Sequence, residues 1–147
     1  MKILKSTICI GLLASCVSCV SPSSIPTEEI STLEKMGLDN PQRSMAGYAH
    51  WTSDIVKVTN LDTKKVIYKP SEWELVNPFG DMYLRLTPSH YQVVTRCTHS
   101  SDKNKRSGRF DELTIEVKGN EKMKLVVNAG GNSCTTNIKT TTYTSES

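Results

Sequence analysis

The sequence predicts an all-β fold, an antiparallel β-sandwich of about seven strands preceded by a short N-terminal helix. Two observations predict it. From Tyr48 onward, hydrophobic residues recur with a period of two in short segments, and residues that favour turns separate those segments. Aromatic residues make up only 6% of the chain, so the core is expected to be aliphatic.

Residues 1–15 have the composition of a cleavable export signal. Lys2 and Lys5 precede an apolar run over residues 8–14, which is too short to span a bilayer. The run ends in Leu13-Ala14-Ser15-Cys16, which resembles the bacterial lipobox of Leu, two small residues and Cys. The resemblance implies that the chain is a bacterial lipoprotein, cut before Cys16 and carrying a diacylglycerol on the Cys16 thiol.

Two alternatives for this segment stay open. Cys19 as the lipid acceptor would place Cys16 where Leu is expected, and a plain secretory signal would be cut near Ser21. If the enterobacterial sorting rule applies, Val17 and Ser18 after the lipidated cysteine, with no Asp, imply transfer to the outer membrane.

The mature chain is small and nearly neutral. Without residues 1–15 it has 132 residues (147 minus 15), with 16 basic (18 minus 2) and 15 acidic side chains, a net charge of +1. This size fits one domain, and this charge is too low for a nucleic-acid footprint.

The cysteines predict one disulfide. Cys9 leaves with the signal and Cys16 takes the lipid, so Cys19, Cys97 and Cys134 remain. Exported chains meet an oxidising compartment, and Cys97 and Cys134 both lie in strand-like segments, so these two are expected to pair. A bridge across their 37-residue separation (134 minus 97) is expected to stabilise the fold by roughly 3–4 kcal/mol.

Between the lipid and the sandwich we expect a tether and a helix. Residues 16–26 are rich in Ser and Pro and predict a flexible tether. Residues 27–47 are expected to hold a short helix and a linker. Thr27 is a plausible cap, acidic residues follow it, and Gly37 is a plausible stop.

The sandwich is expected over residues 48–147, with strands joined by short turns. Alternation predicts a hairpin of 112–118 with 122–127 around Gly119-Asn120, and Gly130-Gly131-Asn132 is expected to form another hairpin turn. The remaining predicted strands are 54–59 paired with 65–69, 82–86 paired with 91–97, and the β-branched segment 134–143.

The pattern Leu84-x-Leu86-x-Pro88-x-x-Tyr91-x-Val93 suggests a type of sandwich. It resembles the turn of transthyretin-like and immunoglobulin-like accessory domains of envelope lipoproteins, although Ser89 stands where Gly is common. The resemblance implies a sandwich of one of these two types.

Candidate catalytic and metal-binding residues are sparse. The histidines are His50, His90 and His99, and Cys97-x-His99 has the spacing of half a zinc site, but no second pair follows it. A Gly-x-Ser-x-Gly nucleophile elbow is absent from the sequence. We therefore expect no metal, no cofactor and no enzymatic activity.

Two features are candidates for contact with a partner. The polar loop from Ser100 to Arg109 is the first, because its cations could contact an acidic partner; the alternative is a solvated loop. Trp73, in a loop-like setting, is the second and would be an interaction anchor if exposed, whereas Trp51 is the better candidate for the core. The cations of the loop are Lys103, Lys105, Arg106 and Arg109.

These features favour a non-enzymatic module that is anchored by lipid in the outer membrane and binds an envelope protein, as an accessory component of a secretion or conjugation complex. The alternative is a periplasmic inhibitor of a hydrolase or a phage-exclusion lipoprotein, because small β domains with disulfides suit that work. The sequence does not identify the partner.

Overall fold

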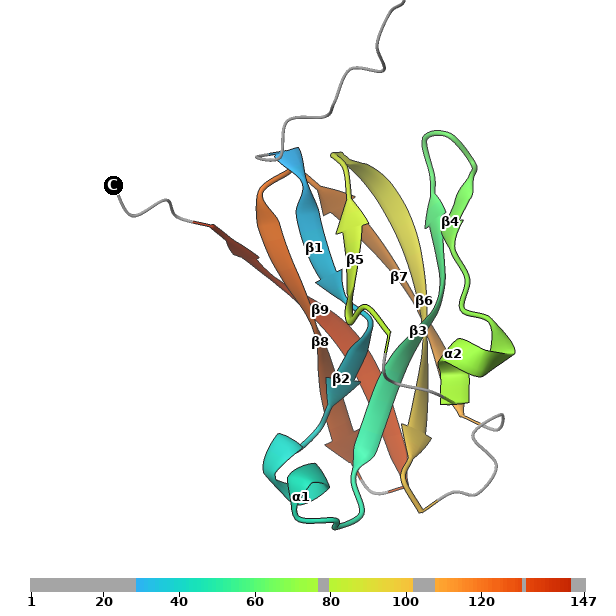
Figure 1. The fold of residues 1–147 in the computed structure, drawn as a ribbon, viewed down its shortest axis with the longest axis vertical. Helices are drawn as coiled ribbons and strands as arrows, with labels where there is room; N and C mark the ends of the chain where they lie inside the picture. The colour runs from blue at the N-terminus through green and yellow to red at the C-terminus, as the bar shows by residue number, and fades with distance from the viewer. Residues whose placement is uncertain (1–28, 77–79, 102–107, 131, 144–147) are drawn as a thin grey trace, which may run out of the picture.

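The computed structural model describes residues 29–76, 80–101, 108–130 and 132–143, which form two β-sheets packed face to face (Figure 1). Sheet A has the order β5-β1-β8-β9, and sheet B has the order β2-β3-β6-β7 with β4 beside β3. The all-β prediction is therefore confirmed. The strands are β1 (Ser31–Glu34), β2 (Met36–Leu38), β3 (Trp51–Asn60), β4 (Val66–Tyr68), β5 (Tyr83–Leu86), β6 (Ser89–His99), β7 (Arg109–Val117), β8 (Glu121–Gly130) and β9 (Ser133–Thr142).

Two helices of five residues lie outside the sheets, α1 (Pro41–Met45) and α2 (Glu72–Val76). The Asn40 side chain caps α1 by accepting a hydrogen bond from the Arg43 backbone N–H at 3.0 Å. Ser71 and Glu74 cap α2 reciprocally, since the Glu74 carboxylate accepts from the Ser71 N–H and the Ser71 hydroxyl accepts from the Glu74 N–H. Within the described residues, no helix has the length and apolarity needed to cross a bilayer.

The core fills the space between the two sheets. Sheet A contributes Leu33, Leu86 and Met123, and sheet B contributes Val58 and Tyr91, among others. All five are at most 2% exposed, as alternate inward residues of facing sheets should be. The core is mainly aliphatic, as the composition predicts.

The predicted helix from Thr27 to Gly37 is wrong over its described part. Residues 31–38 form β1 and β2 instead, and the chain passes from sheet A to sheet B between them, at Lys35. Ser31 and Leu33 are buried while Thr32 and Glu34 are partly exposed, a strand period of two. The sheets therefore begin well before Tyr48.

Two predicted hairpins are also wrong, although their strands exist. Strand β7 lies in sheet B and β8 in sheet A, so Gly119-Asn120 turns the chain from one sheet to the other. Strands β5 and β6 are separated in the same way. The two strands of each pair lie in different sheets instead of sharing a ladder, and both arrangements give the same alternation of buried and exposed residues.

The other two predicted pairings are confirmed. Strands β3 and β4 pair antiparallel, and the Asn60 side chain closes their turn by accepting from the N–H groups of Asp62 and Thr63, both at 2.9 Å. Strands β8 and β9 pair from Glu121↔Thr142 to Gly130↔Ser133, which makes them a hairpin with a two-residue connection.

A disulfide joins Cys97 of β6 to Cys134 of β9, whose Cα atoms are 6.1 Å apart. This pairing is the one that the sequence predicts. Because β6 belongs to sheet B and β9 to sheet A, the bond links the two sheets through the core. It packs with Val127 and Trp51 in a second, smaller apolar cluster.

Gly37 of β2 allows a close approach between the sheets, to Leu125 of β8. A Cβ atom at this position would lie 2.7 Å from the Leu125 carbonyl oxygen and 2.8 Å from the Leu125 Cβ, closer than packed atoms can be.

We expect Gly37→Ala to lower the free energy of unfolding by about 1–3 kcal/mol in urea titrations, because β2 or β8 must shift. Gly130→Ala is the matched control, since nothing lies within 4 Å of its Cβ position. Equal stability of the two variants would contradict this account of Gly37.

Candidate functional site

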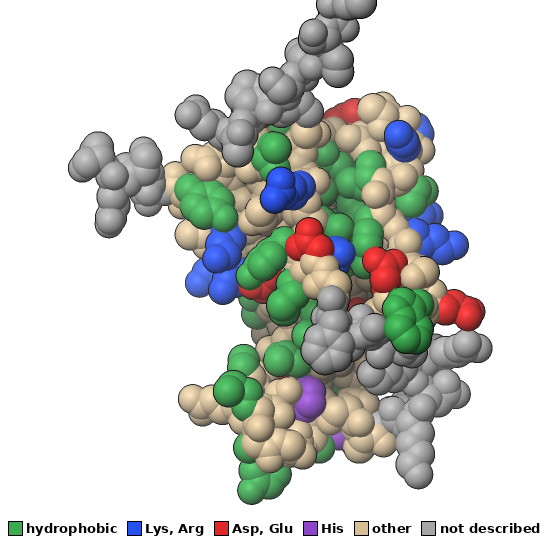
Figure 2. Space-filling view, viewed as in Figure 1, with side chains coloured by type: hydrophobic (Ala, Val, Ile, Leu, Met, Phe, Trp, Pro, Cys, Tyr) green, Lys and Arg blue, Asp and Glu red, His purple; other side chains and the backbone are tan. Residues whose placement is uncertain are grey.

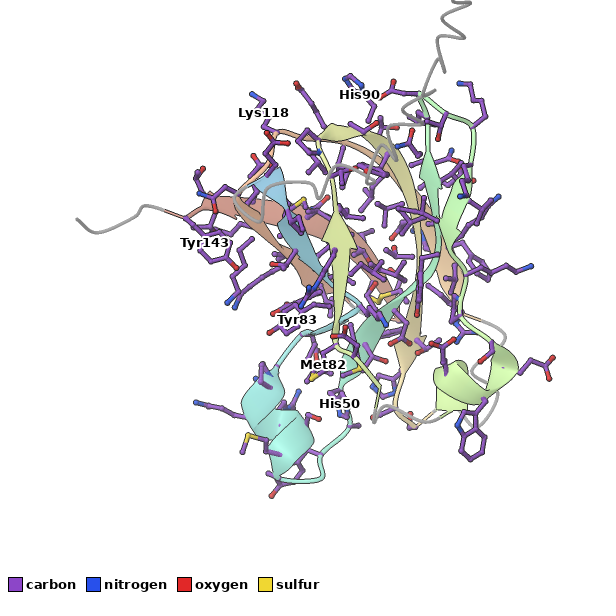
Figure 3. All side chains as sticks on the ribbon, turned by 45° about the horizontal axis from the view of Figure 1, so that its top comes forward. His50, Met82, Tyr83, His90, Lys118 and Tyr143 are labelled. Atoms are coloured by element: carbon purple, nitrogen blue, oxygen red, sulfur yellow. A yellow bond between two sulfur atoms is a disulfide. The ribbon has the colours of Figure 1, made fainter. Side chains whose placement is uncertain are left out.

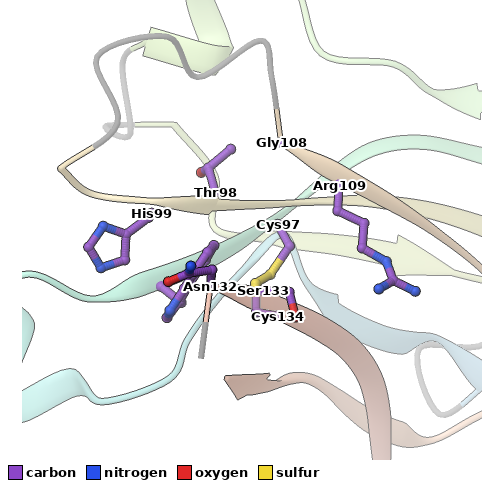
Figure 4. A pocket seen from close by; sticks show the side chains of 9 residues that line it. Cys97, Thr98, His99, Gly108, Arg109, Asn132, Ser133 and Cys134 are labelled. Carbon is purple, nitrogen blue, oxygen red and sulfur yellow. A yellow bond between two sulfur atoms is a disulfide. The ribbon is translucent and has the colours of Figure 1, made fainter. Parts of the chain in front are cut away.

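The candidate site is a hollow of about 230 Å³ beside the disulfide, at the end of the sandwich where β3 begins and β6 ends (Figure 4). We call this end the pocket end. Both sheets contribute to the hollow, since it lies over the bond between β6 and β9. Its lining residues are Trp51, Cys97, Thr98, His99, Gly108, Arg109, Asn132, Ser133 and Cys134.

An aromatic pair forms one wall of the pocket. The rings of Trp51 and His99 meet edge to face, with centroids 4.9 Å apart and an interplanar angle of 65°. Neighbouring backbone fixes this pair, because the Ser100 N–H donates to the His50 carbonyl at 2.9 Å and the His50 N–H donates to the Ser100 hydroxyl at 3.0 Å. The His99 ring also contacts the Ser101 hydroxyl through Nδ1.

Arg109 provides the positive charge of the pocket. Its Nε lies 3.4 Å from one carboxylate oxygen of Asp111, and its side chain is largely exposed. The other Asp111 oxygen accepts from the Thr136 N–H at 2.9 Å, which joins β7 to β9 across the edge of the two sheets. Asp111 therefore holds the arginine against a rigid part of the fold.

The geometry of the pocket suits binding. Three of the groups that line the pocket already have partners within the protein. The Cys97 and Cys134 sulfur atoms are bonded to each other, and the Ser133 hydroxyl donates to the Gly130 carbonyl at 3.4 Å. The remaining groups, the Arg109 guanidinium, the Asn132 amide and the Trp51 ring, can hold a carboxylate or another polar group of a partner.

The opposite end of the sandwich brings together a Ser, a His and an Asp that the sequence analysis did not group. The Ser89 hydroxyl donates to Asp62 at 2.5 Å, and the His90 N–H donates to the same carboxylate oxygen at 3.1 Å. His90 Nδ1 lies 3.4 Å from that oxygen. Serine and histidine both bind the carboxylate, so the serine is not placed to pass its proton to the histidine. The cluster fastens the turn after β3 to the start of β6.

The predicted contact residues have different outcomes. Cys16, Lys103, Lys105 and Arg106 lie outside the described residues, whereas Arg109 is described and lines the pocket. Trp73 is 70% exposed on α2, so it meets the condition for an interaction anchor. Trp51 is half-buried against the disulfide cluster.

The three histidines do not form a metal site in the part of the chain that is described. His50 and His99 lie at the pocket end, and His90 lies at the opposite end (Figure 3). Across the described ranges, no group of three His, Cys, Asp or Glu side chains is arranged to hold a metal ion.

Comparison with models of protein families, with characterised protein sequences and with solved structures found no match to this chain. Its function must therefore be inferred from its own residues.

The Asp62 cluster predicts a pH dependence of stability. Hydrogen bonds from Ser89 and from the His90 N–H lower the pKa of the Asp62 carboxyl below its usual 3.8. A lowered pKa stabilises the fold above the unfolded value, and this contribution is lost as the pH falls through the lowered pKa. We expect Asp62→Asn to be less stable than the native chain at about pH 7 and to approach it at about pH 2, measured by urea unfolding at both pH values. The same difference at both pH values would contradict this role of Asp62.

Proposed function

We propose that this chain is a lipid-anchored protein of the bacterial outer membrane that binds another envelope protein without catalysing a reaction. The observation that carries the proposal is the sequence Leu13-Ala14-Ser15-Cys16 at the end of an export signal. The bond between Cys97 and Cys134 supports it, because disulfides persist in oxidising compartments outside the cytosol. An accessory role in a secretion or conjugation complex is the form of this proposal that we favour.

The position of the N-terminal segment supports a role for the pocket end in partner binding. Ser31, the first residue of β1, accepts from the Glu121 N–H at 3.0 Å, beside Lys118. Figure 3 places Lys118 and His90 at one end of the domain and His50 at the other. Strand β1 therefore begins at the end remote from the pocket, and an anchor that precedes it in the chain would leave the pocket end free to meet a partner.

Exposed apolar side chains near the pocket end support the same proposal. Met45 on α1 is 89% exposed, and Tyr48 follows that helix with 66% of its surface exposed. Figure 1 shows α1 and α2, which carries Trp73, in the same half of the domain as the pocket. Exposed aromatic side chains in the same half of a domain as a pocket with an arginine are features that a protein interface would use.

The type of sandwich is part of the proposal. An immunoglobulin-like or transthyretin-like arrangement is supported by Tyr91 at the start of β6, whose hydroxyl donates to the Thr87 carbonyl at 2.9 Å. A tyrosine that bonds to the backbone a few residues upstream, at a corner between strands, is typical of immunoglobulin-like sandwiches.

The anchor is tested by Cys16→Ser. We expect this variant to incorporate no labelled fatty acid, because the thioether is lost. Cys19→Ser is the matched control and should remain lipidated and membrane-bound. A Cys16→Ser variant that is still labelled with fatty acid would contradict the assignment of the anchor.

The binding end is tested by Trp73→Ala. Because this side chain is exposed, we expect the free energy of unfolding to stay within about 0.5 kcal/mol of the native value. We expect the yield of cross-linked envelope partner, measured in intact cells, to fall at least about tenfold. Ile67→Ala, which truncates an exposed apolar side chain on β4, is the control. Undiminished cross-linking in Trp73→Ala would remove Trp73 from the interface, and a hydrolase as the cross-linked protein would favour an inhibitor.

A further inference from the structure

The outer face of sheet A carries four cationic side chains, which we call the basic face: Arg85 of β5, Lys122 and Lys124 of β8, and Lys139 of β9. They alternate along their strands with residues of the core, such as Leu86, Met123 and Leu125, so they point away from it.

The strand register gathers these cations from distant parts of the sequence. Thr32 of β1 lies opposite both Arg85 and Lys122, so one row of the sheet holds two cations with Thr32 between them. Lys124 lies opposite Lys139 in a second row. Side chains directly opposite each other in a sheet are about 5 Å apart, so the four charges form a flat, dense array.

One carboxylate belongs to this array among the described residues. Glu34 of β1 lies 3.8 Å from Lys124 and offsets one of the four charges. The outer face of sheet B is mixed in charge, because Asp54, Glu112 and Glu116 project from it together with Lys57. An excess of positive charge is therefore a feature of the outer face of sheet A and not of sheet B. Figure 2 shows Lys and Arg side chains gathered over β8 and β9, with hydrophobic side chains beside them.

Two tyrosines border the basic face. Tyr83 lies opposite Glu34 on β5, and the Tyr143 hydroxyl lies 3.5 Å from the Thr32 hydroxyl. Both rings are partly exposed, and both lie on the same side of sheet A in Figure 3. Tyrosine has an apolar ring and a polar hydroxyl, and for this reason it is enriched where protein meets the headgroup region of a bilayer.

We propose that the basic face lies on the surface of a membrane that contains anionic lipids. A flat array of cations is complementary to a flat layer of phosphates, and the bordering tyrosines suit the interface between headgroups and acyl chains. The choice of a membrane as the partner of this face rests on the proposed lipid anchor. At most about 50 Å of chain separates Cys16 from Ser31. An anchor at Cys16 would therefore hold the basic face near the headgroups at high effective concentration.

The test uses full-length chains that all carry Cys16→Ser, so that no acyl chain contributes to binding. Co-sedimentation is measured with vesicles of phosphatidylcholine alone and with vesicles that contain about 30% phosphatidylglycerol. The readout is the increase in partitioning that phosphatidylglycerol causes. It is compared between variants that share the same N-terminal segment, so Lys2 and Lys5 contribute equally to each. We expect this increase to be present and to decline with added salt.

The decisive variant replaces all four cations of the basic face with Gln. Each cation near an anionic bilayer contributes about fivefold to partitioning, and Glu34 offsets Lys124 in the parent chain, so we expect the variant to lose at least about 100-fold. The matched control removes four charges from β3 and from the segments that flank β4: K57Q, K64Q, K65Q and K69Q. We expect the control to lose less than about fivefold. Thermal unfolding of both variants checks that each is folded.

Three results would overturn the inference. The first is that phosphatidylglycerol does not change the partitioning of the parent chain, and the second is that the two fourfold variants lose partitioning equally. The third is that the four cations are needed to capture an acidic protein but not to bind vesicles. Absence of the lipid anchor would be a separate result, which leaves the vesicle measurement unaffected. It is detected by fatty-acid labelling in cells, whereas the vesicle measurement uses chains without the anchor.

Discussion

The disulfide between Cys97 and Cys134 is the interaction on which the pocket end depends. The larger aliphatic cluster fills the rest of the sandwich, but near the disulfide the space between the sheets holds polar side chains, including Ser53 and Thr136, whose hydroxyls are 2.5 Å apart. Burial of such groups contributes little hydrophobic stabilisation. A covalent link between β6 and β9 keeps the sheets together at that point, and it also forms one side of the pocket.

Alternation in the sequence predicts where most strands lie, but it does not predict which strands pair. Residues 112–118 and 122–127 alternate as expected, yet they belong to different sheets. The inward residues of two strands are buried in the same way whether the strands are neighbours in one sheet or face each other in two. The connection at Gly119-Asn120 is a turn in both cases, so local chemistry could not separate them.

Short elements account for the other errors. The segment after Thr27 has acidic residues near its start and a glycine at its end, features that favour a helix, but tertiary contacts override them. Ser31 is buried beside Glu121, and Gly37 packs against Leu125, both far away in the sequence. Helices α1 and α2 have five residues each, too few to show a helical period.

The candidate functional residues also divide into those that the sequence predicts and those that only the structure brings together. The pairing of Cys97 with Cys134 can be predicted from the strand-like segments that hold both cysteines, and the exposure of Trp73 from the turn-forming residues before it. The pocket, the Asp62 cluster and the basic face each join residues that are distant in the chain, such as Arg85 and Lys139, and only strand register brings these together. Together, the two proposals give an exported domain whose basic face lies on the membrane and whose pocket end binds a partner.

Intact mass spectrometry of the chain purified from membranes tests the central claim, that the protein is exported, oxidised and lipidated. The account predicts the mass of residues 16–147 plus a lipid on Cys16, which rises by two hydrogen atoms when the bond between Cys97 and Cys134 is reduced. A mass that corresponds to all 147 residues, without lipid and unchanged by reduction, would contradict it.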